Sequence, residues 1–141
     1  MANIQFYKRN VIAAAILFLV SAFVGMSIGM NYDVRFPVEY DGYYMIKKGE
    51  AMIRAAHTHG MPFALYNLIL AFIIPFLGLS DKMKNLTSWF GILMLIMPLA
   101  LFLRGLIYPA TTLDMLGFVG ATFFLLTSVF VLIGAIKVKK I

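Results

Sequence analysis

The sequence contains no cysteine among its 141 residues. Disulfide bridges, thiolate metal sites, iron–sulfur clusters and haem attached through thioether bonds are therefore excluded. Charged residues are also scarce, at 13% of the chain, against about a quarter in a soluble domain. The chain thus falls outside the compositional range of soluble globular proteins.

The sequence is rich in apolar residues. Hydrophobic residues make up 62% of the chain, and the mean hydropathy is +0.92. A helix needs roughly 20 apolar residues to cross the hydrocarbon core of a bilayer, which is about 30 Å thick. Four such runs are present, at about residues 10–30, 55–79, 86–104 and 114–136. We therefore expect one all-α transmembrane domain, an antiparallel four-helix bundle, with no room for a soluble catalytic domain.

The first apolar run resembles a signal peptide only at its start. Tyr7-Lys8-Arg9 precedes it as a basic tip would. The run is longer than the usual apolar region of about 7–15 residues, and no clear cleavage motif follows it. We expect it to be retained as a transmembrane helix.

Positive charge is distributed unevenly between the two ends of the expected helices. One side carries Lys8, Arg9, Lys82, Lys84, Lys137, Lys139 and Lys140 against Asp81 alone, whereas the other balances Arg35, Lys47, Lys48, Arg54 and Arg104 against Asp33, Glu39, Asp41, Glu50 and Asp114. The positive-inside rule then predicts that both termini are cytoplasmic, in the cytoplasmic (inner) membrane. The net charge of +6 thus reflects membrane orientation and anionic lipid, and we expect no nucleic-acid partner.

Small residues recur at four-residue spacing on two of the expected helices. Ser21, Gly25 and Gly29 form one such face, and Gly117 and Ala121 form another. Small residues let two membrane helices approach closely. The first face is expected mainly to pack within the chain. Both faces are also candidate contacts with other integral membrane subunits or with a second copy.

Both histidines lie in one stretch, Arg54-Ala-Ala-His57-Thr-His59-Gly60-Met-Pro62, next to an outer polar loop expected over residues 31–54. His57 and His59 are about 200° apart on a regular helix, because a turn holds 3.6 residues. Either one faces the bundle and the other faces out, or Gly60 and Pro62 loosen the helix and bring both rings to one site. From about Tyr43 we expect a short interfacial helix that leads into the second span.

Three interpretations of the histidines compete. An imidazole is an axial ligand of haem in the first. In the second, His57 and His59 bind copper or zinc with help from Asp114, Glu50 or Asp41. In the third, they are interfacial polar side chains and no cofactor is bound.

The stretch carries one family resemblance. Arg54-Ala-Ala-His57-Thr-His59, followed by Gly60, Pro62, Asn67 and an apolar run to residue 72, resembles the second helix of the catalytic subunit of haem–copper oxidases and nitric oxide reductases. The resemblance implies that His57 is the position of a low-spin haem b ligand, with Arg54 and Arg104 as partners of the haem propionates.

This chain departs from that family in its histidines. It has two in all, so it lacks the copper centre and cannot reduce oxygen or nitric oxide alone. A second haem ligand would come from His59, from Met52 or Met61, from a second copy or from a partner subunit.

Two functions follow as expectations. The first is a small integral subunit of a respiratory-type membrane complex in electron transport, in which His57 and His59 hold or border a haem, a metal ion or a quinol headgroup. In the quinol version a histidine accepts the hydroxyl proton, and Arg54 or Asp114 orients it. The alternative is a non-catalytic accessory subunit without a cofactor. A transporter is disfavoured, since the middle of each span lacks acids and bases. Arg104 and Asp114 are expected to pair with each other.

Overall fold

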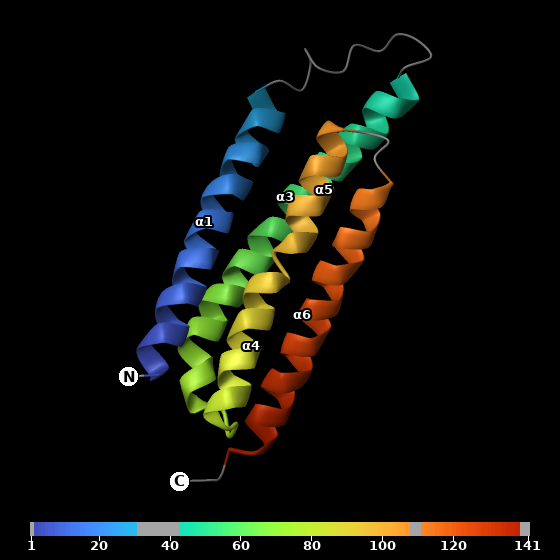
Figure 1. Cartoon of the computed structure of the whole chain (residues 1–141). Coiled ribbons are helices and arrows are strands. Elements are labelled where there is room, and N and C mark those ends of the chain that lie inside the picture. The colour runs from blue at the N-terminus through green and yellow to red at the C-terminus, as the bar shows by residue number, and fades with distance from the viewer. Residues whose placement is uncertain (1, 31–42, 108–110, 139–141) are drawn as a thin grey trace.

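The computed structural model describes residues 2–30, 43–107 and 111–138 (Figure 1). Its elements are α1 (Ala2–Met30), α3 (Tyr43–Ile73), the 3-10 helix η1 (Ile74–Phe76), α4 (Asp81–Leu93), α5 (Ile96–Leu106) and α6 (Thr112–Ile136). Four helical segments are long and apolar enough to cross a membrane, at Gln5–Met26, Gly49–Phe76, Asp81–Leu106 and Thr112–Ile136. The expected all-α character is confirmed for the described residues, which contain no strand. The four segments indicate a multi-pass membrane protein.

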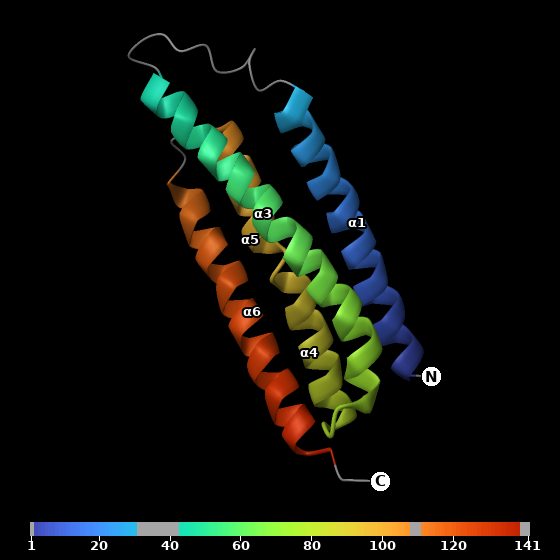
Figure 2. The same cartoon turned by 180° about the vertical axis from the view of Figure 1, so that it is seen from behind.

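The helices lie side by side along a common direction (Figures 1 and 2). α3 packs against α1 on one side and against α5 on the other, and α4 and α5 both pack against α6. Large apolar side chains project outward from the spans, with exposures of 69% for Phe23 and 74% for Phe118. Such a surface suits hydrocarbon as solvent, because exposing so much apolar area to water would cost free energy.

The start of α3 lies where a helix leading into the second span was expected. α3 begins at Tyr43, within the outer polar region of residues 31–54, and continues into the span as a single helix. Gly42 is the last strong helix breaker before it, and Glu50 forms an ion pair with Arg54 one turn later, which supports the helix. Residues 31–42, including Asp41, lie outside the described part of the chain.

The third span is two helices, not one. Pro98 has no N–H to donate to the carbonyl of Met94. The N–H of Met97 donates to that carbonyl instead (3.1 Å), and the N–H of Leu95 donates to the carbonyl of Ile92 (3.0 Å). These tighter bonds separate α4 from α5 at residues 94–95.

A glycine of α6 packs directly against this interruption. A Cβ atom on Gly120 would meet the backbone nitrogen of Met97 and would lie 2.7 Å from its Cβ. Backbone cannot move aside as a flexible side chain can. Gly120 therefore allows α6 to approach the break between α4 and α5, a close contact of the kind that small residues provide in membrane bundles.

A buried chain of hydrogen bonds joins α1, α3 and α4. Ser88 Oγ donates to Asn10 Oδ1, Asn10 Nδ2 donates to Asn67 Oδ1 (2.9 Å), and Asn67 Nδ2 donates to the carbonyl of Gly91 (2.7 Å). The side chains of Asn10, Asn67 and Ser88 are fully buried. A buried polar group without a partner costs about 1–3 kcal/mol, so this network is a strong constraint on how the three helices meet.

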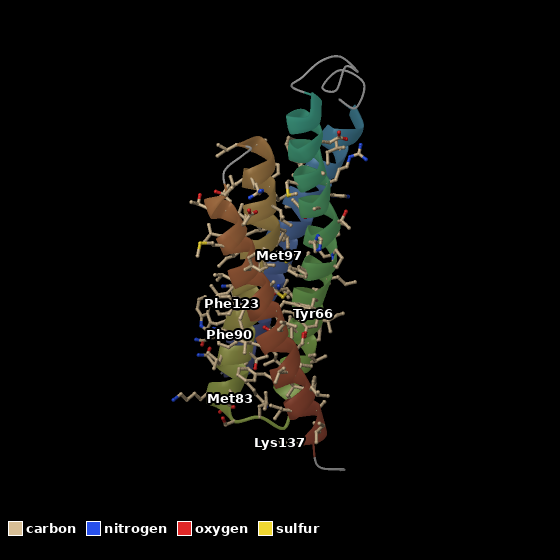
Figure 3. All side chains as sticks on the ribbon, turned by 90° about the vertical axis from the view of Figure 1, so that its right-hand side faces the viewer. Tyr66, Met83, Phe90, Met97, Phe123 and Lys137 are labelled. Atoms are coloured by element: carbon tan, nitrogen blue, oxygen red, sulfur yellow. The ribbon has the colours of Figure 1, made fainter. Side chains whose placement is uncertain are left out.

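Aromatic rings attach α6 to the other helices. Phe123 contacts Phe90 of α4 (5.1 Å between ring centroids), and Phe124 stacks on Phe63 of α3 (5.1 Å). The hydroxyl of Tyr66 is 3.3 Å from Ser128 Oγ, so both side chains have a partner. Figure 3 shows Tyr66, Phe90 and Phe123 at the middle of the bundle.

We predict that Gly120→Ala destabilises the fold by about 1–3 kcal/mol, the usual cost of overpacking. Gly117→Ala is the matched control, because a Cβ there would have nothing within 4 Å, and alanine favours a helix over glycine by about 0.5–1 kcal/mol. Thermal unfolding of both variants in detergent measures the difference. Equal unfolding temperatures for the two variants would contradict the close contact.

Candidate functional site

His57 lies in a tight contact between α3 and α1. Its Nδ1 donates a hydrogen bond to the backbone carbonyl of Ser21 (2.7 Å). The ring covers Gly25, where a Cβ would lie 2.5 Å from His57 Cε1. A Cβ on Gly60, one turn further along α3, would meet Ser21 Oγ. We call these four residues the α1–α3 seam. Ser21 and Gly25 thus serve packing within the chain.

The hydrogen bond to Ser21 determines the tautomer of His57. A carbonyl oxygen only accepts hydrogen bonds, so the proton lies on Nδ1. The neutral imidazole then carries its lone pair on Nε2. This arrangement, with Nδ1–H bonded to a backbone carbonyl, is the usual one for an imidazole that acts as an acceptor or ligand through Nε2.

Two cavities border His57. The outer crevice, of about 500 Å³, is lined by Arg54, His57 and Thr58 of α3 and by Ala22, Gly25, Met26 and Ile28 of α1. The apolar groove, of about 330 Å³, lies toward α4 and α5, and its lining includes Ala13, Leu17, Val20, Ile92, Leu99 and Phe102. Polar side chains are concentrated in the outer crevice, which makes it the candidate site.

His59 belongs to a different face of α3. Its Nδ1 donates to the carbonyl of Ala55 (2.7 Å), and its ring lies edge-on to Phe63 (6.4 Å between centroids). α3 continues through Gly60 and Pro62 without interruption. The two rings therefore diverge as regular helix geometry predicts, and they do not share one site.

The charged candidates form two ion pairs. Glu50 pairs with Arg54 within α3. Arg104 of α5 pairs with Asp114 of α6, which confirms that expectation. Arg104 and Asp114 line a third cavity, of about 390 Å³, between α5 and α6. Arg104 thus lines neither of the cavities at His57.

The residues expected to bind a metal do not assemble. In residues 2–30, 43–107 and 111–138, no three histidine, aspartate or glutamate side chains are grouped so that they could hold a metal ion. His57 is directed toward α1, His59 bonds its own helix, and Asp114 pairs with Arg104. The proposed set of His57, His59 and Asp114 is therefore separated over three places.

The two small-residue faces differ in what covers them. Gly25 is covered by His57 of the same chain, while the surroundings of Gly29 are outside the described residues. Gly117 has nothing within 4 Å of the position of its missing Cβ, and it lines the α5–α6 cavity together with Ala121. Only the second face therefore leaves a described glycine open to another helix.

Sequence reasoning missed the partner of His57. A backbone carbonyl such as that of Ser21 has no sequence signature, because all residues carry one. It also missed the bonds between Asn10, Asn67 and Ser88, although amides within or beside an apolar run are visible in the sequence as polar groups that need a partner.

Comparison of the chain with protein-family models, with curated proteins and with solved structures finds no match. The resemblance of residues 54–72 to haem–copper oxidases therefore stays a prediction.

We predict that Gly25→Ala displaces the His57 ring and breaks its bond to Ser21, because the added methyl would lie 2.9 Å from Nδ1. Imidazole ¹⁵N NMR reports the loss as a change in the Nδ1–H signal of His57. The signal of His59 should not move, and Gly117→Ala, which adds a methyl into open space, should change neither. An unchanged His57 signal in Gly25→Ala would refute the seam.

Proposed function

We propose that the chain is a small integral membrane subunit of a redox complex, and that its outer crevice binds the headgroup of a quinol. In this proposal a quinol hydroxyl donates a hydrogen bond to Nε2 of His57. The guanidinium of Arg54 and the Thr58 side chain, which line the same crevice, orient the ring of the quinol.

The observation that carries the proposal is the bond from His57 Nδ1 to Ser21 (2.7 Å). It supports an acceptor at Nε2, and a quinol hydroxyl is a donor. Proton acceptance by a neutral imidazole is the usual role of histidine in such chemistry. The crevice volume of about 500 Å³ falls within the range of about 300–1,000 Å³ typical of small-molecule sites.

We prefer a quinol to copper, zinc or haem b as the ligand of His57, because a quinol needs only one acceptor from the protein. Copper or zinc would need further donors. The described residues contain no group of three such side chains that could hold a metal ion, and the linings of the two cavities at His57 include no carboxylate or second imidazole. A haem on His57 would take its other ligand from Met26 in the same crevice or from a partner subunit. The haem interpretation is kept as one outcome of the test below.

The proposal includes an orientation. With both termini in the cytoplasm, as the charge distribution favours, the outer crevice faces the non-cytoplasmic side of the cytoplasmic membrane. His57 then lies about two turns inside Gly49, the start of its span. A headgroup at this depth is reached from the lipid phase, where quinols reside.

A second candidate is a non-catalytic accessory subunit that binds no cofactor. The open face at Gly117 and Ala121 favours the accessory function, since glycine costs helix stability and no described residue occupies the space beside Gly117. Gly117→Leu should then abolish co-purification of partner subunits and leave the binding of a quinol unchanged. Retained partners in Gly117→Leu would contradict this candidate.

We predict that His57→Ala weakens binding of a short-chain benzoquinol to the purified protein about tenfold, the value of one hydrogen bond of about 1–1.5 kcal/mol. His59→Ala is the control and should bind normally. Isothermal titration in detergent measures both affinities. Absence of binding by the unmodified protein would refute the proposal, and a Soret band that disappears in His57→Ala would replace quinol by haem.

Labelling of single introduced cysteines tests the predicted orientation. The natural sequence has no cysteine, so no other thiol in the chain would react. Ser80→Cys, between the second and third spans, should resist a membrane-impermeant thiol reagent in intact cells. Thr111→Cys, between the third and fourth spans, should react. The reverse pattern would place the outer crevice on the cytoplasmic side.

A further inference from the structure

Arg9 differs from the other arginines whose contacts are described. It lies inside the first span, Gln5–Met26. Arg54 and Arg104 each pair with a carboxylate, whereas no described carboxylate lies within ion-pair distance of Arg9. Charged groups at membrane depth normally have a counter-charge, so the charge of Arg9 calls for one from outside the chain.

The guanidinium of Arg9 is held in a defined position. Nε donates to Ser88 Oγ (2.6 Å), and Nη2 donates to the carbonyl of Asn85 (2.9 Å). Its carbon atom lies 4.8 Å from the ring centroid of Trp89 and 5.3 Å from that of Phe6. These contacts use neutral acceptors and aromatic faces, and Nη1 makes no hydrogen bond to a described residue. An arginine fork of this kind is suited to a phosphate.

An apolar groove begins one turn beyond Arg9. Ala13 is the first α1 residue that lines it, about 6 Å further along the helix. On the α4 side, Ile92 follows Ser88 by one turn and lines the same groove. Ile16 lines it as well and lies seven residues after Arg9, on the same face of α1. The cation thus lies about one helical turn from the start of the groove.

The surface around Arg9 is suited to a lipid. Lys8 is exposed beside it, and Trp89 is 48% exposed, as expected of an aromatic residue at headgroup depth. Along the same face of α1, Ile16 and Phe23 are 58% and 69% exposed. A ligand that meets all of these features has a phosphate at one end and a hydrocarbon chain at the other.

We propose that this place binds one anionic phospholipid. Its phosphate contacts Arg9, and one acyl chain lies in the groove between α1 and α4–α5. Through Ser88 the lipid is connected to the buried bonds between Asn10 and Asn67, so its binding stabilises the contact of three helices. The inference does not depend on a quinol at His57.

The test compares lipid binding by variants in detergent, followed by native mass spectrometry and by the unfolding temperature. Long-chain phosphatidylglycerol should bind the unmodified protein at one site and raise its unfolding temperature. Arg9→Gln should weaken this binding at least tenfold. Lys8→Gln removes a neighbouring cation of the same charge and should weaken it less than threefold. Arg9→Lys, which keeps the charge and loses the fork, should behave like Arg9→Gln.

The groove is tested separately. Ala13→Phe fills its start and should weaken binding of long-chain phosphatidylglycerol, whereas Ala15→Phe, on an exposed position outside the groove, should not. Equal losses in Lys8→Gln and Arg9→Gln would overturn the proposal, because they would indicate diffuse charge attraction. So would an equal stabilisation by inorganic phosphate or by phosphatidylcholine, or unchanged binding in Ala13→Phe.

Discussion

Hydrocarbon offers no hydrogen-bond partner, and this constraint explains the contacts between the first three spans. Asn10, Asn67 and Ser88 are fully buried, and they satisfy one another across α1, α3 and α4. Apolar burial gives little net drive between helices in a membrane, so such bonds and close backbone contacts determine which faces meet. Two further buried hydroxyls follow the same constraint: Thr87 and Thr127 each donate to a carbonyl one turn earlier.

The same constraint shapes the candidate site. His57 satisfies its Nδ1–H on the carbonyl of Ser21, and Gly25 leaves room for the ring. The consequence is an imidazole with a fixed position, whose neutral form carries its lone pair on Nε2. A histidine on an exposed helix face would be free to rotate, and its role would then be set by solvent rather than by the fold. The chemistry proposed for the crevice therefore depends on how closely α1 approaches α3.

Arg9 lies toward the opposite end of α1. Two of its nitrogens have partners within the protein, and no described carboxylate compensates its charge. The two proposed ligands thus lie toward opposite ends of α1, one beside His57 of α3 and the other beside Arg9. His57 lines both the outer crevice and the apolar groove, whereas Arg9 lies about one turn before the first α1 residue of the groove.

The sequence by itself determined the four apolar spans, the start of a helix near Tyr43 and the pairing of Arg104 with Asp114, because these depend on length, helix breakers and charge. Only the tertiary structure decided that His57 and His59 diverge, that the third span is interrupted before Pro98, and that Ser21 holds His57. The reason is physical. Which helix faces meet, and which backbone carbonyl accepts a given proton, depends on contacts between residues far apart in the chain, and a single sequence carries no local signal for them.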